Sequence, residues 1–177
     1  MNSFFTHDNE EMQQIIRNHP KVNVQQFKQS KFPRIREHDH RHLASIYPME
    51  DKQHYYPPGH GDVYRCLKRL NIDSEYIFIS NSDNLSATFD NKIYKYLQEN
   101  PSIDFLMEMT DKTPLDVKGG TVMRYDNQLI LIESAQVPDE HWDKFLSVPY
   151  FNTNNLWIKT KAIPDDMKMK VIKNIKK

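Results

Sequence analysis

Glycine is scarce in this sequence, with four residues among 177, whereas average usage would give about a dozen. The four are concentrated in two places, Gly59 with Gly61 and Gly119 with Gly120. Glycine adopts positive φ without strain and lets a ligand approach the backbone closely. The concentration therefore indicates either two ordinary turns or two places of close ligand approach.

Other features that the sequence lacks exclude several classes of protein. A single cysteine, Cys66, excludes an internal disulfide framework and is typical of a reducing compartment. No apolar run approaches the roughly 20 residues of a membrane helix, and the first residues lack the basic start and apolar centre of a signal peptide. With 24 basic and 24 acidic residues the net charge is zero, which argues against a polyanion-binding surface. We therefore expect a cytoplasmic protein that binds neither a membrane nor nucleic acid.

The spacing of apolar residues predicts a chain of mixed helices and strands without an internal linker or repeat. Residues 8–19 have the spacing of an amphipathic helix with Asp8 as its cap, and Val22 with Val24 suggests a short strand. Alternation predicts a strand over 105–109 and a hairpin that turns at Asp126–Asn127. At this length the chain can form one domain with a real core.

The stretch Tyr76–Ile79 is a short apolar strand that leads directly into polar residues. Its apolar residues do not alternate with polar ones, so we expect a central strand that is buried on both faces of a helix-covered sheet. In open α/β sheets, ligands bind beyond the carboxyl ends of the strands. A carboxylate placed there can hold a divalent cation against a substrate phosphate. Asp83 is therefore either a metal ligand or the cap of the next helix.

His60 lies between two glycines in front of a segment with helical spacing. Unpaired backbone N–H groups at a helix N-terminus favour anions. The segment Tyr55–Asp62 is thus either a phosphate site with a histidine beside it or a tight turn.

Two further polar clusters are ambiguous. Histidines at positions 38, 40 and 42 would point the same way only on a strand, and no apolar pattern supports a strand there, so we expect a solvated loop and not a metal site. The asparagines of Phe151–Asn155 could hydrogen-bond a hydroxyl-rich ligand or form a turn.

In their order along the chain, these segments resemble the central catalytic part of eukaryotic-type UDP-glucose pyrophosphorylase, also called UTP–glucose-1-phosphate uridylyltransferase. The resemblance covers nearly all of the sequence and implies an α/β fold. That fold is a mixed, mostly parallel sheet flanked by helices, Rossmann-like or GT-A-like, and here incomplete at both ends. The matching stretches are Phe27–Ile35, Tyr56–Asp62, Glu75–Leu85, Asp111–Thr121, Glu133–Pro138 and Phe151–Ile158.

The resemblance also implies a reaction, in which glucose 1-phosphate attacks the α-phosphorus of UTP with the help of Mg²⁺ and pyrophosphate leaves. By resemblance, Asp83 binds the magnesium ion and His60 contacts the sugar phosphate. Gln29 contacts the uracil, and Gly59 contacts the nucleotide through its backbone. The remaining residues implied in substrate binding are Asn81, Ser82, Gly120, Glu133 and Asn154.

The sequence departs from the family pattern in what it omits. It contains no glycine-rich loop to wrap the UTP phosphates, and the family's later lysine and C-terminal β-helix domain have no counterpart. We therefore expect residues 1–177 to be a partial nucleotidyltransferase catalytic domain. Two alternatives remain: a non-catalytic remnant that binds nucleotide sugar or a partner, and a related pyrophosphorylase for another sugar phosphate. Exposed sheet edges would favour a homo-oligomer.

Overall fold

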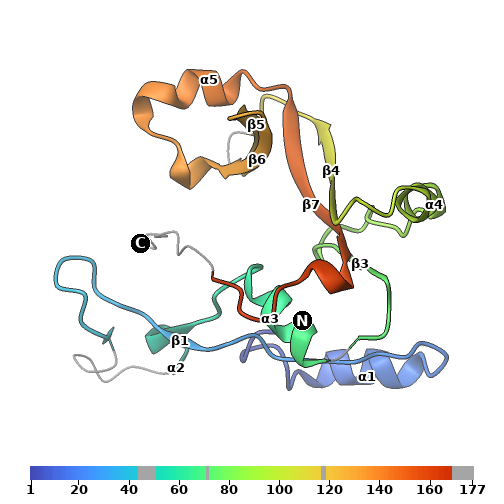
Figure 1. Ribbon diagram of the computed structural model, residues 1–177. Coiled ribbons are helices and arrows are strands. Elements are labelled where there is room, and N and C mark those ends of the chain that lie inside the picture. The colour runs from blue at the N-terminus through green and yellow to red at the C-terminus, as the bar shows by residue number, and fades with distance from the viewer. Residues whose placement is uncertain (44–50, 71, 117–118, 169–177) are drawn as a thin grey trace. The chain divides into compact units, whose positions relative to one another are not determined.

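The structure is a computed structural model that describes residues 1–43, 51–70, 72–116 and 119–168. The chain divides into two compact units (Figure 1). Unit 1 comprises Met1–Ile72 and Asp165–Met167. Unit 2 comprises Asp73–Pro164 and Lys168–Lys177.

Unit 1 consists of short elements joined by irregular segments. Its first helix begins after Asn9, whose side chain accepts a hydrogen bond from the Met12 N–H, so the prediction of Asp8 as the cap is wrong. The predicted strand at Val22 and Val24 is also wrong, because those residues form no strand. The elements are α1 (Glu10–Asn18), β1 (Phe32–Pro33), α2 (Asp51–His54), β2 (Tyr55–Tyr56) and α3 (Asp62–Arg69), with β1 and β2 paired antiparallel.

The histidine-rich segment of unit 1 is an exposed loop, as predicted, with a turn over residues 37–39. The Asp39 carboxylate accepts hydrogen bonds from the guanidinium groups of Arg36 and Arg41. Those contacts, chiefly the one with Arg36, hold the pKa of Asp39 well below its usual range. The carboxylate of this segment is therefore already engaged by two cations.

Unit 2 contains the larger core and most of the strands. Its elements are β3 (Tyr76–Ile79), α4 (Asn91–Glu99), β4 (Phe105–Asp111), β5 (Gly120–Tyr125), β6 (Gln128–Glu133), η2 (Ser134–Gln136), η3 (Asp139–His141), α5 (Trp142–Leu146), β7 (Tyr150–Lys159) and η4 (Thr160–Ala162).

The main sheet of unit 2 has the order β3-β7-β4, and both pairings are antiparallel. The mostly parallel sheet predicted from the sequence is therefore wrong for the described residues, although the mixed α/β class is confirmed. β7 and not β3 is the central strand, because Asn155–Ile158 are all buried whereas Ile77–Ile79 are only half-buried. A parallel pairing occurs at a bridge between Asn2 and Lys28 in unit 1.

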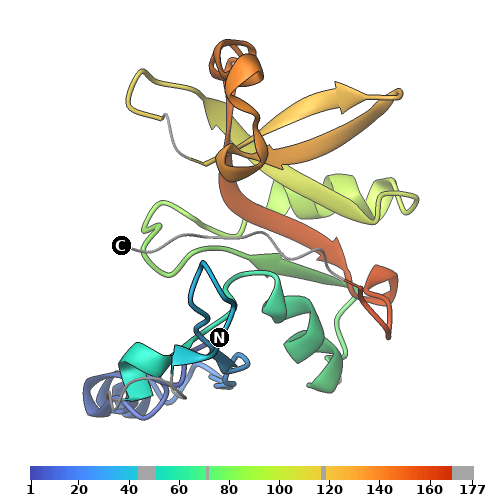
Figure 2. The same cartoon turned by 90° about the vertical axis from the view of Figure 1, so that its left-hand side faces the viewer.

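The predicted hairpin is confirmed. β5 and β6 pair antiparallel, and Figure 2 shows them as a twisted two-stranded ribbon. The turn residues Asp126 and Asn127 have φ values of 45° and 60°. Two successive positive φ values give a turn whose twist matches that of the flanking strands.

The core of unit 2 forms where α4 packs on the sheet. Trp157 of β7 and Leu97 of α4 are both 0% exposed, and they cluster with Tyr76 of β3. The side chain of Asp90 caps α4 by accepting a hydrogen bond from the Lys92 N–H.

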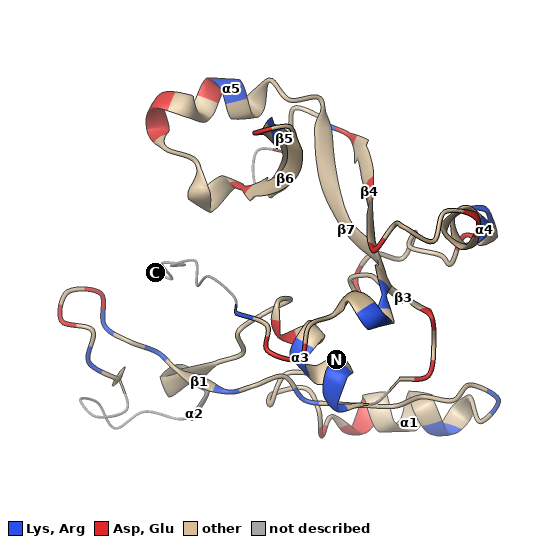
Figure 3. Ribbon diagram, in the orientation of Figure 1, with Lys and Arg blue, Asp and Glu red and all other residues tan. Residues whose placement is uncertain are grey.

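Figure 3 shows basic and acidic residues interspersed along the ribbon of each unit. Within the described ranges, no helix has the length and apolar character that a membrane span requires.

Candidate functional site

Asp83 lies in a turn directly after β3. The Asn84 N–H donates to the Asn81 carbonyl at 3.2 Å, which places Ser82 and Asp83 at the two central positions of the turn. Both of these central residues are exposed. Since α4 is capped by Asp90, the interpretation of Asp83 as a helix cap is wrong.

Two consecutive asparagines of β7 hold the two ends of this turn. Nδ2 of Asn154 donates to Oδ1 of Asn81 at 2.7 Å. Nδ2 of Asn84 donates to Oδ1 of Asn155 at 3.4 Å. All four of these residues are at least half-buried. The turn that carries Asp83 is thus anchored to the central strand of the sheet.

Asn154 reaches the turn because β7 bulges at this point. Glu108 of β4 pairs with Asn155, whereas the next residue of β4 pairs with Asn152, so Thr153 and Asn154 are two extra residues on β7. Asn154 has a φ of 59°, in the left-handed region that asparagine tolerates better than most residues. The Asn152 side chain accepts from the Asn154 N–H at 2.8 Å and stabilises this conformation. The asparagine cluster therefore forms a bulge that supports the Asp83 turn.

Gly120 and Glu133 face each other across the β5–β6 hairpin. Gly120 is buried, and a Cβ at this position would lie 2.7 Å from Oε1 of Glu133 and 2.8 Å from Cδ1 of Leu131. The carboxylate thus lies directly against bare backbone. A carboxylate beside backbone polar groups suits a ligand with hydroxyl groups, which donate and accept hydrogen bonds.

In unit 1, Gln29 and Gly59 also lie together. The Gly59 N–H donates to Oε1 of Gln29 at 3.1 Å. Gly59 has a φ of 92°, and nothing lies within 4 Å of the position that its Cβ would occupy. Its backbone is therefore open to a ligand on that side. His60 follows in the same turn, is exposed, and accepts through its carbonyl from the Val63 N–H at 3.1 Å.

Asp62 supports this turn and was not singled out in the sequence. Its carboxylate is 4% exposed and accepts hydrogen bonds from the Ser30 N–H at 2.6 Å and the Ser30 hydroxyl at 3.1 Å. It therefore fixes the segment beside Gln29 to the first turn of α3. Burial and the Asp62 carboxylate raise the pKa of the Cys66 thiol, so this thiol is poorly suited to act as a nucleophile.

Glu108, Asn155 and Asn84 were likewise missed. A usable signal was present, because Glu108 is an acidic residue on a strand whose other inward-facing residue, Leu106, packs against the core. An acidic side chain at such a position needs a hydrogen-bond partner, and the structure supplies two from β7.

The Asp83 carboxylate suits a cation that the protein shares with a substrate. Among the described residues, no group of three or more His, Cys, Asp or Glu side chains is placed to hold a metal ion. The exposed Asp83 carboxylate takes part in no hydrogen bond or ion pair within that part of the chain. Mg²⁺ is commonly held by one or two carboxylates, with substrate phosphates and water completing its shell. Asp83 fits this arrangement.

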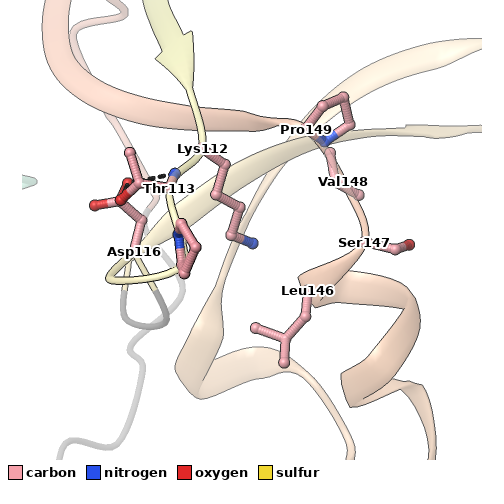
Figure 4. Close-up of a pocket in the computed structure, with 8 residues that line it drawn as sticks. Lys112, Thr113, Asp116, Leu146, Ser147, Val148 and Pro149 are labelled. Carbon is pink, nitrogen blue, oxygen red and sulfur yellow. Dashed lines mark hydrogen bonds between the residues drawn. The ribbon is translucent and has the colours of Figure 1, made fainter.

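Two pockets of unit 2 are lined neither by Asp83 nor by the asparagines that anchor its turn. The larger, of about 370 Å³, is lined by residues 112–116 and 146–149 (Figure 4). Its cation, Lys112, donates to the Phe145 carbonyl at 3.3 Å and lies over the Phe145 ring. Asp116 accepts from the Thr113 N–H and hydroxyl, contacts that lower its pKa. Because these charged groups already have partners, we favour the anchored turn over this pocket as the chemical site.

The structure therefore brings predicted residues together in pairs within each unit. In unit 2 these are Asn81 with Asn154 and Gly120 with Glu133, and in unit 1 they are Gln29 with Gly59. The substrate contact of His60 and the metal-binding role of Asp83 stay predictions.

Comparison with known proteins gives a consistent result. The model of the UTP–glucose-1-phosphate uridylyltransferase family matches residues 1–177. Curated enzymes of that name from Pyrus pyrifolia and Hordeum vulgare are 44% and 43% identical over 99% of this chain. The chain spans 40% of the length of each of these relatives.

Solved structures agree in fold. A crystal structure of UDP-glucose phosphorylase from Trypanosoma brucei matches 92% of this chain and 39% of its own, with a TM-score of 0.77 and 34% identity. A UDP-glucose pyrophosphorylase mutant from Leishmania major, solved in complex with UDP-glucose, matches 91% of this chain and 39% of its own, with a TM-score of 0.69 and 29% identity.

The mixed α/β fold and these matches define the class of protein as nucleotidyltransferases. The chain belongs to the UTP–glucose-1-phosphate uridylyltransferase family.

Proposed function

We propose that this chain forms part of a UTP–glucose-1-phosphate uridylyltransferase that makes UDP-glucose and pyrophosphate in the cytoplasm. The observation that carries the proposal is the exposed Asp83 carboxylate on a turn that Asn154 and Asn155 anchor to the central strand. Names of relatives with 44% and 43% identity support the choice of substrates.

In the proposed reaction, a phosphate oxygen of glucose 1-phosphate attacks the α-phosphorus of UTP. A bond forms between that oxygen and the α-phosphorus as the bond to the bridging oxygen breaks, and pyrophosphate leaves with the electron pair. No covalent enzyme intermediate is needed, so positioning and charge stabilisation supply the catalysis. This agrees with a Cys66 thiol whose pKa is raised by burial and by Asp62.

Asp83 would hold Mg²⁺ together with the substrate phosphates. When bound, the ion offsets the negative charge that develops on the phosphoryl oxygens. The amide oxygen of Asn81 accepts from Asn154, so these two residues would position the turn beside the bound sugar. Glu133, lying against Gly120, would accept hydrogen bonds from sugar hydroxyls.

The residues of unit 1 would bind the nucleotide and the sugar phosphate. Gln29 has its side-chain carbonyl fixed by the Gly59 N–H, so its amide N–H₂ is oriented to donate to a uracil carbonyl. The open side of Gly59 lets the nucleotide approach the backbone. His60 would donate a hydrogen bond to the phosphate of glucose 1-phosphate.

The test is pyrophosphate release from UTP with glucose 1-phosphate, and in parallel with other hexose and N-acetylhexosamine 1-phosphates. Asp83→Asn is expected to lower kcat by about 100-fold, the usual scale for loss of one electrostatic stabiliser. Asp90→Asn is the matched control, because asparagine caps a helix as well as aspartate does and Asp90 caps α4.

Full turnover in Asp83→Asn would disprove the metal-binding role. Faster turnover with another sugar phosphate would correct the substrate. Binding of UDP-glucose without pyrophosphate release would favour a non-catalytic binding protein.

A further inference from the structure

Glu108 occupies a position between two polar groups of β7. Register places Glu108 opposite Asn155, and Trp157 lies two residues further along on the same face. Oε1 of Glu108 accepts from the Trp157 indole N–H at 2.7 Å, and Oε2 accepts from Nδ2 of Asn155 at 3.1 Å. The carboxylate therefore joins the two side chains across the strand pair.

These contacts continue to the turn that carries Asp83. Asn155 is 6% exposed and uses its remaining side-chain atom, Oδ1, to accept from Nδ2 of Asn84. Glu108 also acts through its backbone, since its carbonyl accepts from the Thr153 hydroxyl in the bulge at 2.7 Å. A continuous chain of hydrogen bonds thus runs from Trp157 through Glu108 and Asn155 to Asn84.

The charge of Glu108 sets the direction of this chain. An ionised carboxylate only accepts hydrogen bonds, whereas an amide has one donor end and one acceptor end. Because Glu108 accepts, Asn155 must present its N–H₂ to Glu108 and its oxygen to Asn84. If the Asn155 amide were reversed, its oxygen would face the Glu108 carboxylate. Two buried acceptors without a donor between them lower the stability of the fold.

We propose that Glu108 is a positioning residue for uridylyl transfer, which fixes the amide orientation of Asn155 and thereby the turn that presents Asp83 to the nucleotide sugar. The ligand in this inference rests on the proposed function. Among the described residues, the Glu108 side chain is linked to the turn that carries Asp83 through Asn155.

Glu108→Gln tests this inference with almost no change in shape. The new amide must keep its oxygen toward the Trp157 indole N–H, so its own N–H₂ faces Asn155. Asn155 must then turn its oxygen toward position 108 and its N–H₂ toward Asn84, so Asn84 keeps this hydrogen bond only by reversing its own amide. The anchor at the Asn84 end of the turn should therefore be rearranged, although no atom has been removed from the core and the Asn154–Asn81 hydrogen bond remains.

The first readout is the affinity for UDP-glucose, measured by titration calorimetry. We expect Glu108→Gln to raise Kd by about tenfold, the scale seen when a group that orients a ligand-holding residue is lost. The second readout is the backbone and side-chain amide NMR signals of residues 81–84, which should shift without any ligand. Glu99→Gln is the matched control, because Glu99 is 62% exposed and pairs with Lys95 on α4.

A compensating variant separates orientation from packing. In Glu108→Gln combined with Asn155→Asp, the glutamine N–H₂ donates to the aspartate, and the aspartate accepts again from Asn84. The double variant should return Kd to within about threefold of the original protein and restore the signals of residues 81–84. A double variant no better than Glu108→Gln alone would overturn the inference.

Unchanged signals of residues 81–84 in Glu108→Gln would also overturn it, even if the urea midpoint of unfolding fell, because that result describes a purely structural residue. If the unaltered protein binds no UDP-glucose, the proposed function fails, and the NMR comparison still decides whether Glu108 orients the turn.

Discussion

At the scale of single residues, Gly120 shows one reason for a glycine in a sequence that contains few of them. A Cβ there would lie 2.7 Å from Oε1 of Glu133, so a carboxylate occupies the space of the missing side chain. Gly59 serves differently, since its φ of 92° requires glycine while the space beside it is open. The sequence alone could not separate these two reasons, because both give the same residue.

Gly120→Ala should move the Glu133 carboxylate without unfolding the hairpin. The two atoms nearest to the new Cβ, Oε1 of Glu133 and Cδ1 of Leu131, are the far ends of flexible side chains. We expect a loss of about 1 kcal/mol in the free energy of unfolding. The KM for glucose 1-phosphate should rise about tenfold, with the KM for UTP nearly unchanged. Steady-state kinetics with each substrate varied in turn measure both values.

The control is the same substitution in a Glu133→Ala background. If Gly120→Ala acts by displacing the carboxylate, it should add nothing to the KM for glucose 1-phosphate once that carboxylate is gone. An undiminished effect in this background would mean that Gly120 acts through its own backbone instead.

Asp83 illustrates how far the sequence could go at a single position. Aspartate after an apolar strand suits both a helix cap and a metal ligand, and periodicity cannot choose between them. The structure excludes the cap, because α4 begins eight residues later and Asp90 caps it. The metal-binding role itself stays a prediction from resemblance.

At the scale of elements, the sequence predicted the positions of strands and of the hairpin better than it predicted which strands pair with each other. The runs at Ile77–Ile79 and Leu156–Ile158 are both apolar and unbroken, so each could have been the central strand. Burial decided for β7, which pairs with strands on both sides. Strand order depends on long-range pairing that no local pattern specifies, and for this reason the predicted parallel sheet was wrong. The bulge at Thr153–Asn154 was equally invisible, because asparagines favour turns as well.

The cap of α4 gives a prediction at this scale. Asp90→Ala removes the side-chain acceptor for the Lys92 N–H, at 2.7 Å, and should lower the free energy of unfolding by about 1 kcal/mol. Asp83→Ala should lower it by less than about 0.5 kcal/mol, as is usual for exposed positions. Urea titrations followed by tryptophan fluorescence are suitable, because α4 packs on the buried Trp157. A larger loss for Asp83→Ala would return the capping role to Asp83.

At the scale of the whole molecule, the two units differ in how much apolar surface they bury. Among the described residues, the buried apolar side chains of unit 1 are Val63, Cys66 and Leu67 of α3, and none of the nine residues of α1 is buried. Unit 2 buries a larger set, which comprises Tyr76, Leu97, Phe145, Leu156, Trp157, Ile158 and Ile163. Each fully buried large apolar side chain contributes roughly 1.5–3 kcal/mol, so unit 2 should be the more stable by several such contributions.

This difference predicts that unfolding is not a single transition. Both tryptophans, Trp142 and Trp157, belong to unit 2, so their fluorescence reports on that unit alone. Far-UV circular dichroism reports on both units, because α1 and α3 of unit 1 contribute as well as α4 and α5. In a urea titration, the dichroism should therefore begin to fall at a lower concentration than the fluorescence. Trp142→Phe leaves the fully buried Trp157 as the reporter and should keep the two curves apart. Superimposable curves would show that the two units unfold together. That result would contradict the prediction drawn from the small buried core of unit 1.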